Sequence, residues 1–234
     1  MKKISMKYTA TLIFLALGLA AQAGRKEMPE FNSLVVAGNA TVFLASDDYP
    51  GYIDVEGPDE SITSVWSDSN LVLVVNGNPP TAIRISSNKL SMVSLSANAT
   101  LIAEGGIEAQ NLVLSGADQC TFKIPRLKAE NVTVSLVMQS SIEMRKLVCR
   151  DLGLSITGNS SMDISGLECG KVDAVAGDNS VINLSGRCGK KNIVLINEGV
   201  INTKGLIEDG VSYVSKDMKE SNSSPKTSIS VNIP

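Results

Sequence analysis

The sequence predicts an all-β fold, a single-stranded β-helix or β-solenoid with coils of about 20 residues. Three observations predict it: a repeat of that period after residue 89, apolar alternation within each repeat, and no 3.6-residue spacing after residue 23. Four blocks align without a gap, at residues 111–130, 131–150, 151–170 and 171–190. Because one coil cannot bury its own apolar face, the blocks are expected to stack.

The columns of these blocks predict which side chains face the core. The second, fourth, twelfth and fourteenth places are apolar in every block, and the seventeenth place is Leu in three of them. This period-two alternation predicts three short strands per coil, with coils roughly 4.8 Å apart. The crossover rule for parallel strands predicts a right-handed coil. One inward file should hold the fourth-place residues and a residue near Val194: Leu114, Val134, Leu154 and Ala174.

The chain divides into three segments. Residues 1–23 combine early lysines, a short apolar run and Ala21-Gln22-Ala23, which predicts a signal peptide and no transmembrane anchor. Residues 24–213 are expected to form one solenoid domain, with an irregular β capping region at 31–88 and regular coils at 89–210. Residues 214–234 are expected to form a polar tail, whose last residues, SISVNIP, could return as a strand.

Charge and leader together predict where the protein works. Without residues 1–23 the chain has 18 basic and 24 acidic residues, a net charge of −6. This balance disfavours nucleic acid and anionic membranes as partners. The predicted location is therefore outside the cytoplasm: periplasm, cell surface or extracellular space. The partner is left unknown, with a glycan or a protein at the cell surface as the classes considered, and homo-oligomers are left open.

The cysteine positions leave a disulfide undecided. Cys149 and Cys169 take the nineteenth place of successive blocks, where earlier coils have Ala109 and Ala129. Small residues in that column are expected to fill the core as buried thiols. Stacked coils would also bring the two Cα atoms about 5 Å apart, within disulfide range. Cys120 and Cys188 fall in other columns, without an obvious mate.

The composition argues against catalysis. The chain has no histidine, which excludes His-dependent triads, His-ligated zinc and a His general base. Turns of two to four residues leave no room for a substrate groove. We therefore expect a non-catalytic adhesin or envelope-binding solenoid without cofactor or metal. Two alternatives stay open: a protein-binding regulator of the envelope, and a polysaccharide lyase or hydrolase using Asp47, Asp48, Asp54 and Glu56.

One weak candidate ligand surface lies before the regular repeats: Asp47, Asp48, Tyr49, Tyr52 and Trp66. Aromatic rings there could stack on sugars, or they could cap the open end of the core. The acidic residues also fit ordinary exposed turns. A column of amides within the repeats is expected to be a structural ladder at a coil corner, next to Asp118 and Asp178: Gln119, Gln139, Asn159 and Asn179.

The sequence resembles a bacterial family named putative auto-transporter adhesin, head GIN domain. The resemblance rests on FNSLVVAGNATVFLAS from Phe31, then YIDVEGPDE, then the LSANA, LSGAD and SITGNSS steps, and it covers residues 31–210. It implies an exported β-solenoid of Bacteroidetes type, at the surface or in the periplasm, and carries over no catalytic residue. The repeated Gly-Ala-Gly corner of the family is degraded here, for example at Thr157-Gly158-Asn159.

Overall fold

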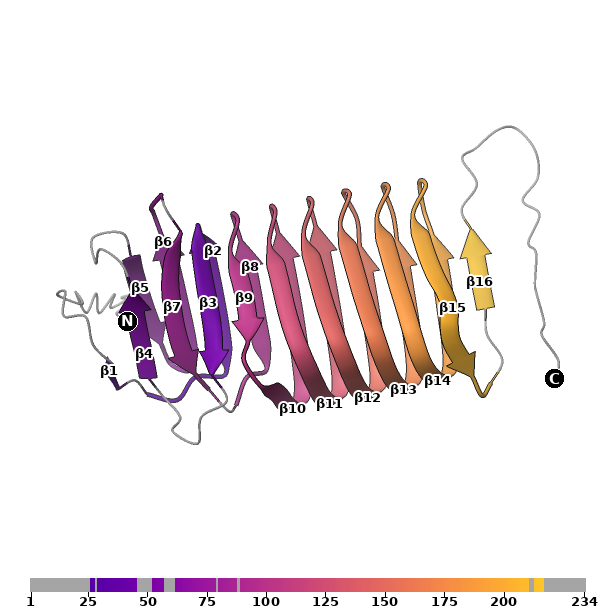
Figure 1. The fold of residues 1–234 in the computed structure, drawn as a ribbon, viewed down its shortest axis with the longest axis horizontal. Coiled ribbons are helices and arrows are strands. Elements are labelled where there is room, and N and C mark those ends of the chain that lie inside the picture. The colour runs from indigo at the N-terminus through magenta and orange to yellow at the C-terminus, as the bar shows by residue number, and fades with distance from the viewer. Residues whose placement is uncertain are drawn as a thin grey trace, which may run out of the picture.

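The computed structural model describes residues 26–27, 29–45, 52–56, 62–78, 80–87, 89–210 and 213–216. In this part of the chain sixteen strands and no helix build a β-solenoid of about six turns, with coils about 20 residues apart. Figure 1 shows the coils stacked along one long axis. The predicted fold class is confirmed. The predicted signal peptide and the tail beyond residue 216 lie outside the described residues and remain predictions.

Long parallel strands form the regular coils, and each pairs with the next strand in the chain. The strands are β10 (Gly106–Ala117), β11 (Thr121–Val137), β12 (Ser141–Ile156), β13 (Ser161–Ala176), β14 (Val181–Leu195) and β15 (Val200–Glu208), with β16 (Tyr213–Lys216) beside β14. The predicted inward file is confirmed, because all its members are at most 5% exposed: Leu114, Val134, Leu154, Ala174 and, in the fifth coil, Ile193.

Each regular strand runs unbroken around most of a coil, whereas the alternation predicted three short strands. β11 is 17 residues long and β12 is 16. Their ladder continues past the break in the inward alternation between Ile124 and Leu127, and Leu127 pairs with Leu147. The neighbouring coil has the same break, so the strand pairing continues across it. The chain leaves strand geometry only at one tight corner per coil, such as residues 118–120.

A one-residue register change between β13 and β14 moves a cysteine into a new column. Leu167 pairs with Gly186, one residue short of the usual spacing. Gly186 has φ +128°, and a Cβ there would lie 2.2 Å from the Leu167 carbonyl oxygen, so this position requires glycine. The change brings Cys188 into register with Cys169. The expectation that Cys188 lies in another column without a mate is therefore wrong.

The region expected to be irregular, residues 31–88, contains two further coils. Its parallel strands are β2 (Ser33–Gly38), β3 (Ala40–Ala45), β6 (Asn70–Val75) and β7 (Thr81–Ser86), followed by β8 (Met92–Ser96) and β9 (Thr100–Ala103). β2 lies between β6 and β8, and β3 lies between β7 and β9. The first coil in the sequence is thus inserted between two later ones. That order, rather than irregular backbone, hides the repeat.

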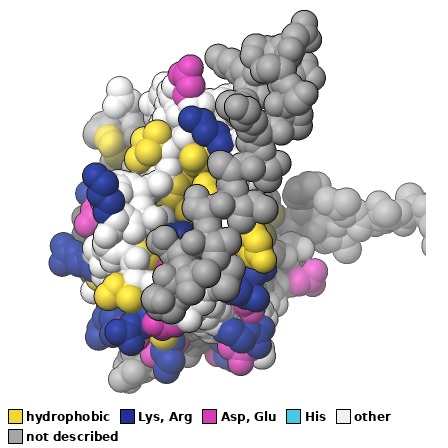
Figure 2. Space-filling model, turned by 90° about the vertical axis from the view of Figure 1, so that its right-hand side faces the viewer, with side chains coloured by type: hydrophobic (Ala, Val, Ile, Leu, Met, Phe, Trp, Pro, Cys, Tyr) yellow, Lys and Arg dark blue, Asp and Glu magenta, His cyan; other side chains and the backbone are white. Residues whose placement is uncertain are grey.

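The expected capping function of this region is met by antiparallel strands. β4 (Tyr52–Glu56) pairs with β7, β5 (Ile62–Ser67) pairs with β6, and β1 (Lys26–Glu27) pairs with β4. The indole ring of Trp66 meets the buried ring of Phe31 edge to face, with centroids 5.8 Å apart. At the opposite end, three apolar side chains stay more than half exposed: Ile207, Tyr213 and Val214. Figure 2, which looks onto this end of the molecule, shows hydrophobic side chains beside Lys, Arg, Asp and Glu side chains.

Candidate binding ridge at the tight corner

From β8 onward, the tight corner of each coil is built from two successive residues in the left-handed backbone region. Their φ angles lie between 42° and 69° in all six turns. Only glycine adopts this region without strain, and Asn and Asp tolerate it better than most residues. The six pairs are rich in these residues: Ala97–Asn98, Asp118–Gln119, Met138–Gln139, Gly158–Asn159, Asp178–Asn179 and Asn197–Glu198. We call this edge the corner ridge.

Backbone hydrogen bonds between successive turns hold the corner ridge together. The amide of Asn98 donates to the Asp118 carbonyl at 2.9 Å, and the amide of Gln119 donates to the Met138 carbonyl at 2.9 Å. The same bond recurs from Gln139 to Gly158 at 2.8 Å. The residues of the amide column are exposed in four successive turns: Gln119, Gln139, Asn159 and Asn179.

A buried file of serines lies directly beneath the corner ridge. Ser140, Ser160 and Ser180 are at most 2% exposed. The hydroxyl of Ser160 donates to the Thr157 carbonyl at 2.8 Å and accepts the backbone amide of Ser140 at 3.3 Å. Cys120 takes the same place in the preceding coil, with its thiol 3.0 Å from the Ala117 carbonyl. This file links four successive turns from the inside through hydrogen bonds between backbone amides and serine hydroxyls.

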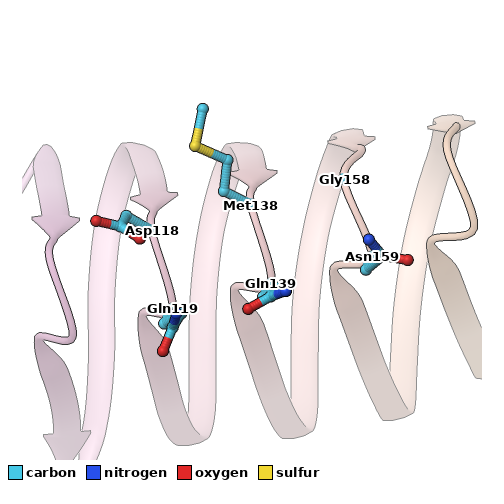
Figure 3. A pocket seen from close by; sticks show the side chains of 6 residues that line it. All are labelled: Asp118, Gln119, Met138, Gln139, Gly158 and Asn159. Atoms are coloured by element: carbon cyan, nitrogen blue, oxygen red, sulfur yellow. The ribbon is translucent and has the colours of Figure 1, made fainter.

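An open hollow of about 400 Å³ lies along the middle of the ridge. Its six lining residues come from three consecutive turns, as Figure 3 shows: Asp118, Gln119, Met138, Gln139, Gly158 and Asn159. Gly158 has no side chain, so the surface is lower there. The Met138 side chain is 63% exposed and stands away from the turn in the figure. The hollow therefore offers amides, one carboxylate and one flexible apolar side chain.

The two aspartates of the corner ridge, Asp118 and Asp178, are not arranged as a catalytic pair. Asp178 accepts the Thr157 hydroxyl at 2.5 Å and the Asn197 side-chain amide at 3.1 Å, which lowers the pKa of its carboxyl. Asp118 lies three coils away, roughly 14 Å at the usual spacing of about 4.8 Å. Paired carboxylates of glycosidases are at most about 9.5 Å apart. Within the described residues, no group of three or more Asp, Glu or Cys could hold a metal ion.

Two residues of the candidate surface predicted from the sequence, Tyr52 and Trp66, lie in the described part of the chain. Tyr52 is 4% exposed in β4, where its hydroxyl accepts the Arg84 guanidinium at 3.3 Å. Trp66 packs against the core at the end of the solenoid. Asp47, Asp48 and Tyr49 lie outside the described residues, so their part in a ligand surface remains a prediction.

Two of the four acidic residues considered for the enzyme alternative lie on β4, near the N-terminal end of the solenoid. Asp54 lies on β4 opposite Arg84 on β7, and Glu56 ends the same strand. The amide column, by contrast, was visible in the sequence. It stacks at a coil corner as expected, but it also forms the exposed, hollowed edge of the molecule.

Comparisons with known proteins support the fold. No protein-family model matches the chain, and no curated protein matches it significantly. A crystal structure described as a putative adhesin from Bacteroides fragilis superposes with TM-score 0.62 and 18% identity over 83% of this chain and 95% of that one. A putative adhesin from Parabacteroides merdae gives 0.63 and 15% over the same shares. A putative lipid binding protein from Parabacteroides distasonis gives 0.53 and 10% over 83% and 96%.

These neighbours show what the chain is similar to in shape. At such low identities the likeness extends to the fold alone, and it includes proteins of different descriptions. The two neighbours described as putative adhesins come from Bacteroides and Parabacteroides. In the residues that the structure describes, no helix is long and apolar enough to cross a membrane.

Proposed function

We propose that this protein is an exported, non-catalytic binding protein of the bacterial cell envelope, and that the corner ridge binds an extended glycan. The observation that carries the proposal is the file of exposed amide side chains, held at one coil spacing by buried serines and backbone hydrogen bonds. Amide groups both donate and accept hydrogen bonds, as sugar hydroxyls do. Their regular spacing suits a ligand that itself repeats.

The ridge suits adhesion because hydrogen bonds between turns hold its side chains in place and the same arrangement recurs in successive coils. A preorganised site loses little conformational entropy when the ligand binds. Each turn contributes few contacts, so one sugar unit should bind weakly, and a polymer that spans several turns should bind more tightly. Met138 can pack its exposed side chain against the apolar face of a sugar ring. The adhesin descriptions of the structural neighbours support the same function class.

The test compares two sets of variants on an array of bacterial and host glycans of increasing length. Gln119, Gln139 and Asn159 are changed together to glycine, which removes the side chains and tolerates their positive φ. Asn111 and Asn131, whose side-chain amides form a ladder outside the corner ridge, are changed together to alanine as the control. The triple variant should lose binding at least tenfold, and the control should lose much less. Equal binding by all three proteins would contradict the ridge as the glycan site.

Two further readouts separate the alternatives. Binding to envelope or matrix proteins in place of any glycan would favour a protein-binding adhesin or regulator. A sugar-release assay on the same polymers tests the enzyme alternative, with Asp47, Asp48, Asp54 and Glu56 changed together to Asn or Gln. Release by the parent but not by that quadruple variant would overturn the non-catalytic proposal.

A further inference from the structure

Three cysteines lie in one file across three consecutive coils. Cys149 on β12 pairs in register with Cys169 on β13, and Cys169 pairs in register with Cys188 on β14. Earlier coils have Ala109 and Ala129 in register at the corresponding place. Cys149 is 8% exposed and Cys188 is fully buried, whereas Cys169 is partly exposed. The middle cysteine is thus the one that solvent reaches most easily.

The first two thiols of this file are already in contact. The Cys149 thiol donates to Cys169 Sγ, with the sulfur atoms 3.2 Å apart. A disulfide bond is about 2.05 Å long and forms when the Cα atoms are roughly 4.4–6.8 Å apart. Neighbouring strands of a sheet are spaced by about 4.8 Å, inside that range. Bond formation therefore needs only a small movement of the two side chains.

The same contact makes the two thiols chemically unequal. The hydrogen bond from Cys149 lowers the pKa of Cys169 and raises the pKa of Cys149. Cys169 is therefore the better thiolate and, because it is partly exposed, the more accessible nucleophile. Burial raises the pKa of Cys188 and of Cys120. Cys120 belongs to the serine file and serves as an internal control.

We propose that Cys149 and Cys169 form a reversible disulfide between adjacent coils, and that Cys188 is a reserve thiol that can replace Cys149 as the partner of Cys169. The oxidant is an external disulfide, such as glutathione disulfide. The Cys169 thiolate attacks one sulfur of that disulfide and displaces one thiolate, which leaves a mixed disulfide. The Cys149 thiol then loses its proton and attacks Cys169 Sγ, and the second thiolate leaves. Two protein thiols become one disulfide, and one external disulfide becomes two thiols.

Thiol counting on the full chain tests this redox site. The protein is incubated with excess glutathione disulfide, denatured without reductant, and alkylated, and its cross-linked peptides are mapped by mass spectrometry. We expect two of the four thiols to react, from Cys120 and Cys188, with Cys149 linked to Cys169. Four reactive thiols, or a link to Cys120, would overturn the proposal.

Single alanine variants identify which thiols take part. Cys169→Ala removes the shared member of the file, so the three remaining thiols should all react. Cys149→Ala should leave one reactive thiol, Cys120, because Cys169 then bonds to Cys188. Three reactive thiols in this variant would refute the reserve function of Cys188. Cys120→Ala is the matched control and should keep the link between Cys149 and Cys169. Alanine already occupies the column of Cys149 and Cys169 in two coils, so the variants at these two positions are expected to fold.

Discussion

The regular coils and the N-terminal coils stack in one solenoid but differ in how the chain reaches them. From β10 to β14 every strand pairs with strands one coil earlier and later in the sequence. In the N-terminal part Ser33 pairs with both Asn70 and Met92. The first coil is thus completed only after two later segments have been placed on either side of it. One stack of coils contains a sequential repeat and a non-sequential insertion.

This difference teaches how a solenoid can end. A purely sequential repeat leaves an open sheet edge at each end, where unpaired strands invite association. The N-terminal insertion places antiparallel β4 and β5 beyond β7 and β6, and it places Trp66 over Phe31. At the other end, the described residues include no strand beyond β15 and β16, and Tyr213 is 62% exposed. Pairing strands out of sequence order therefore costs conformational entropy, because longer loops must be closed, but it covers the N-terminal end of the core.

The largest effect is expected from Leu154→Asp in the middle of the regular coils. Leu154 is 3% exposed, so the change removes a core side chain and buries a charge, at a cost of about 4 kcal/mol or more. Ser155→Asp, exposed on the same strand, is the control and should change little. Urea unfolding followed by circular dichroism measures both.

The same variant shows whether the two regions unfold separately. Coils in a solenoid contact mainly their neighbours, so damage at Leu154 should spare the distant N-terminal coils. Trp66 is the single tryptophan and lies in that region, so its fluorescence reports on the N-terminal coils. In Leu154→Asp, fluorescence should change at higher urea than circular dichroism. Coincident transitions would mean that the two regions unfold as one unit.

The next effect concerns the turn that joins the two strands of the inserted coil. Gly38 has φ +104°, and a Cβ there would lie 1.9 Å from the Val75 carbonyl oxygen of the neighbouring coil. Gly38→Ala should therefore destabilise the protein by about 3 kcal/mol, through backbone strain and steric conflict. In the regular coils, a Cβ on Gly153 would meet no atom closer than 3.9 Å. Gly153→Ala should be neutral or slightly stabilising in the same unfolding measurement.

The two regions also explain which parts of the fold could be predicted from sequence. Alternation at places such as Leu114 and Val134 fixes both the inward face and the register, because the partner lies one period away. The partners of Ser33 lie at unrelated distances in the chain, so no column reveals them. Cys188 was misplaced for a related reason: the register change at Gly186 is a backbone event that composition does not mark.

The candidate site could be predicted only in part, because the sequence does not show the hollow in the corner ridge or the burial of single side chains. The amide column at Gln119 and Gln139 was evident, and its stacking at a corner was foreseen. The hollow at this corner depends on Gly158, which has no side chain, and on Met138, whose side chain points outward. Both features become visible only when three consecutive turns are stacked in the structure. From the sequence, Tyr52 was predicted to lie on the surface. It is buried because β4 pairs with β7 in the antiparallel direction, and the sequence pattern does not show this pairing.

A comparison of the two ends gives a smaller expected effect. Trp66→Ala removes a partly buried ring from the N-terminal cap and should cost about 2 kcal/mol, below the full cost of a core aromatic. Tyr213→Ala at the open end should change the free energy of unfolding by less than about 0.5 kcal/mol, since its side chain is largely exposed. Circular dichroism is the suitable probe, because Trp66→Ala removes the fluorophore. Equal losses at both ends would show that Trp66 does not seal the core.

The smallest effect is expected where other coils already have the substituted residue at the same place in the repeat. Cys149→Ala and Cys169→Ala, measured in reductant, should each cost less than about 1 kcal/mol, because Ala109 and Ala129 already fill this column. Reductant keeps the cross-coil disulfide from contributing to either value. Thermal unfolding of the two variants beside the parent measures the difference. A loss above about 2 kcal/mol would mean that the column is packed differently around sulfur than around a methyl group. The regular coils would then be less interchangeable than their sequence indicates.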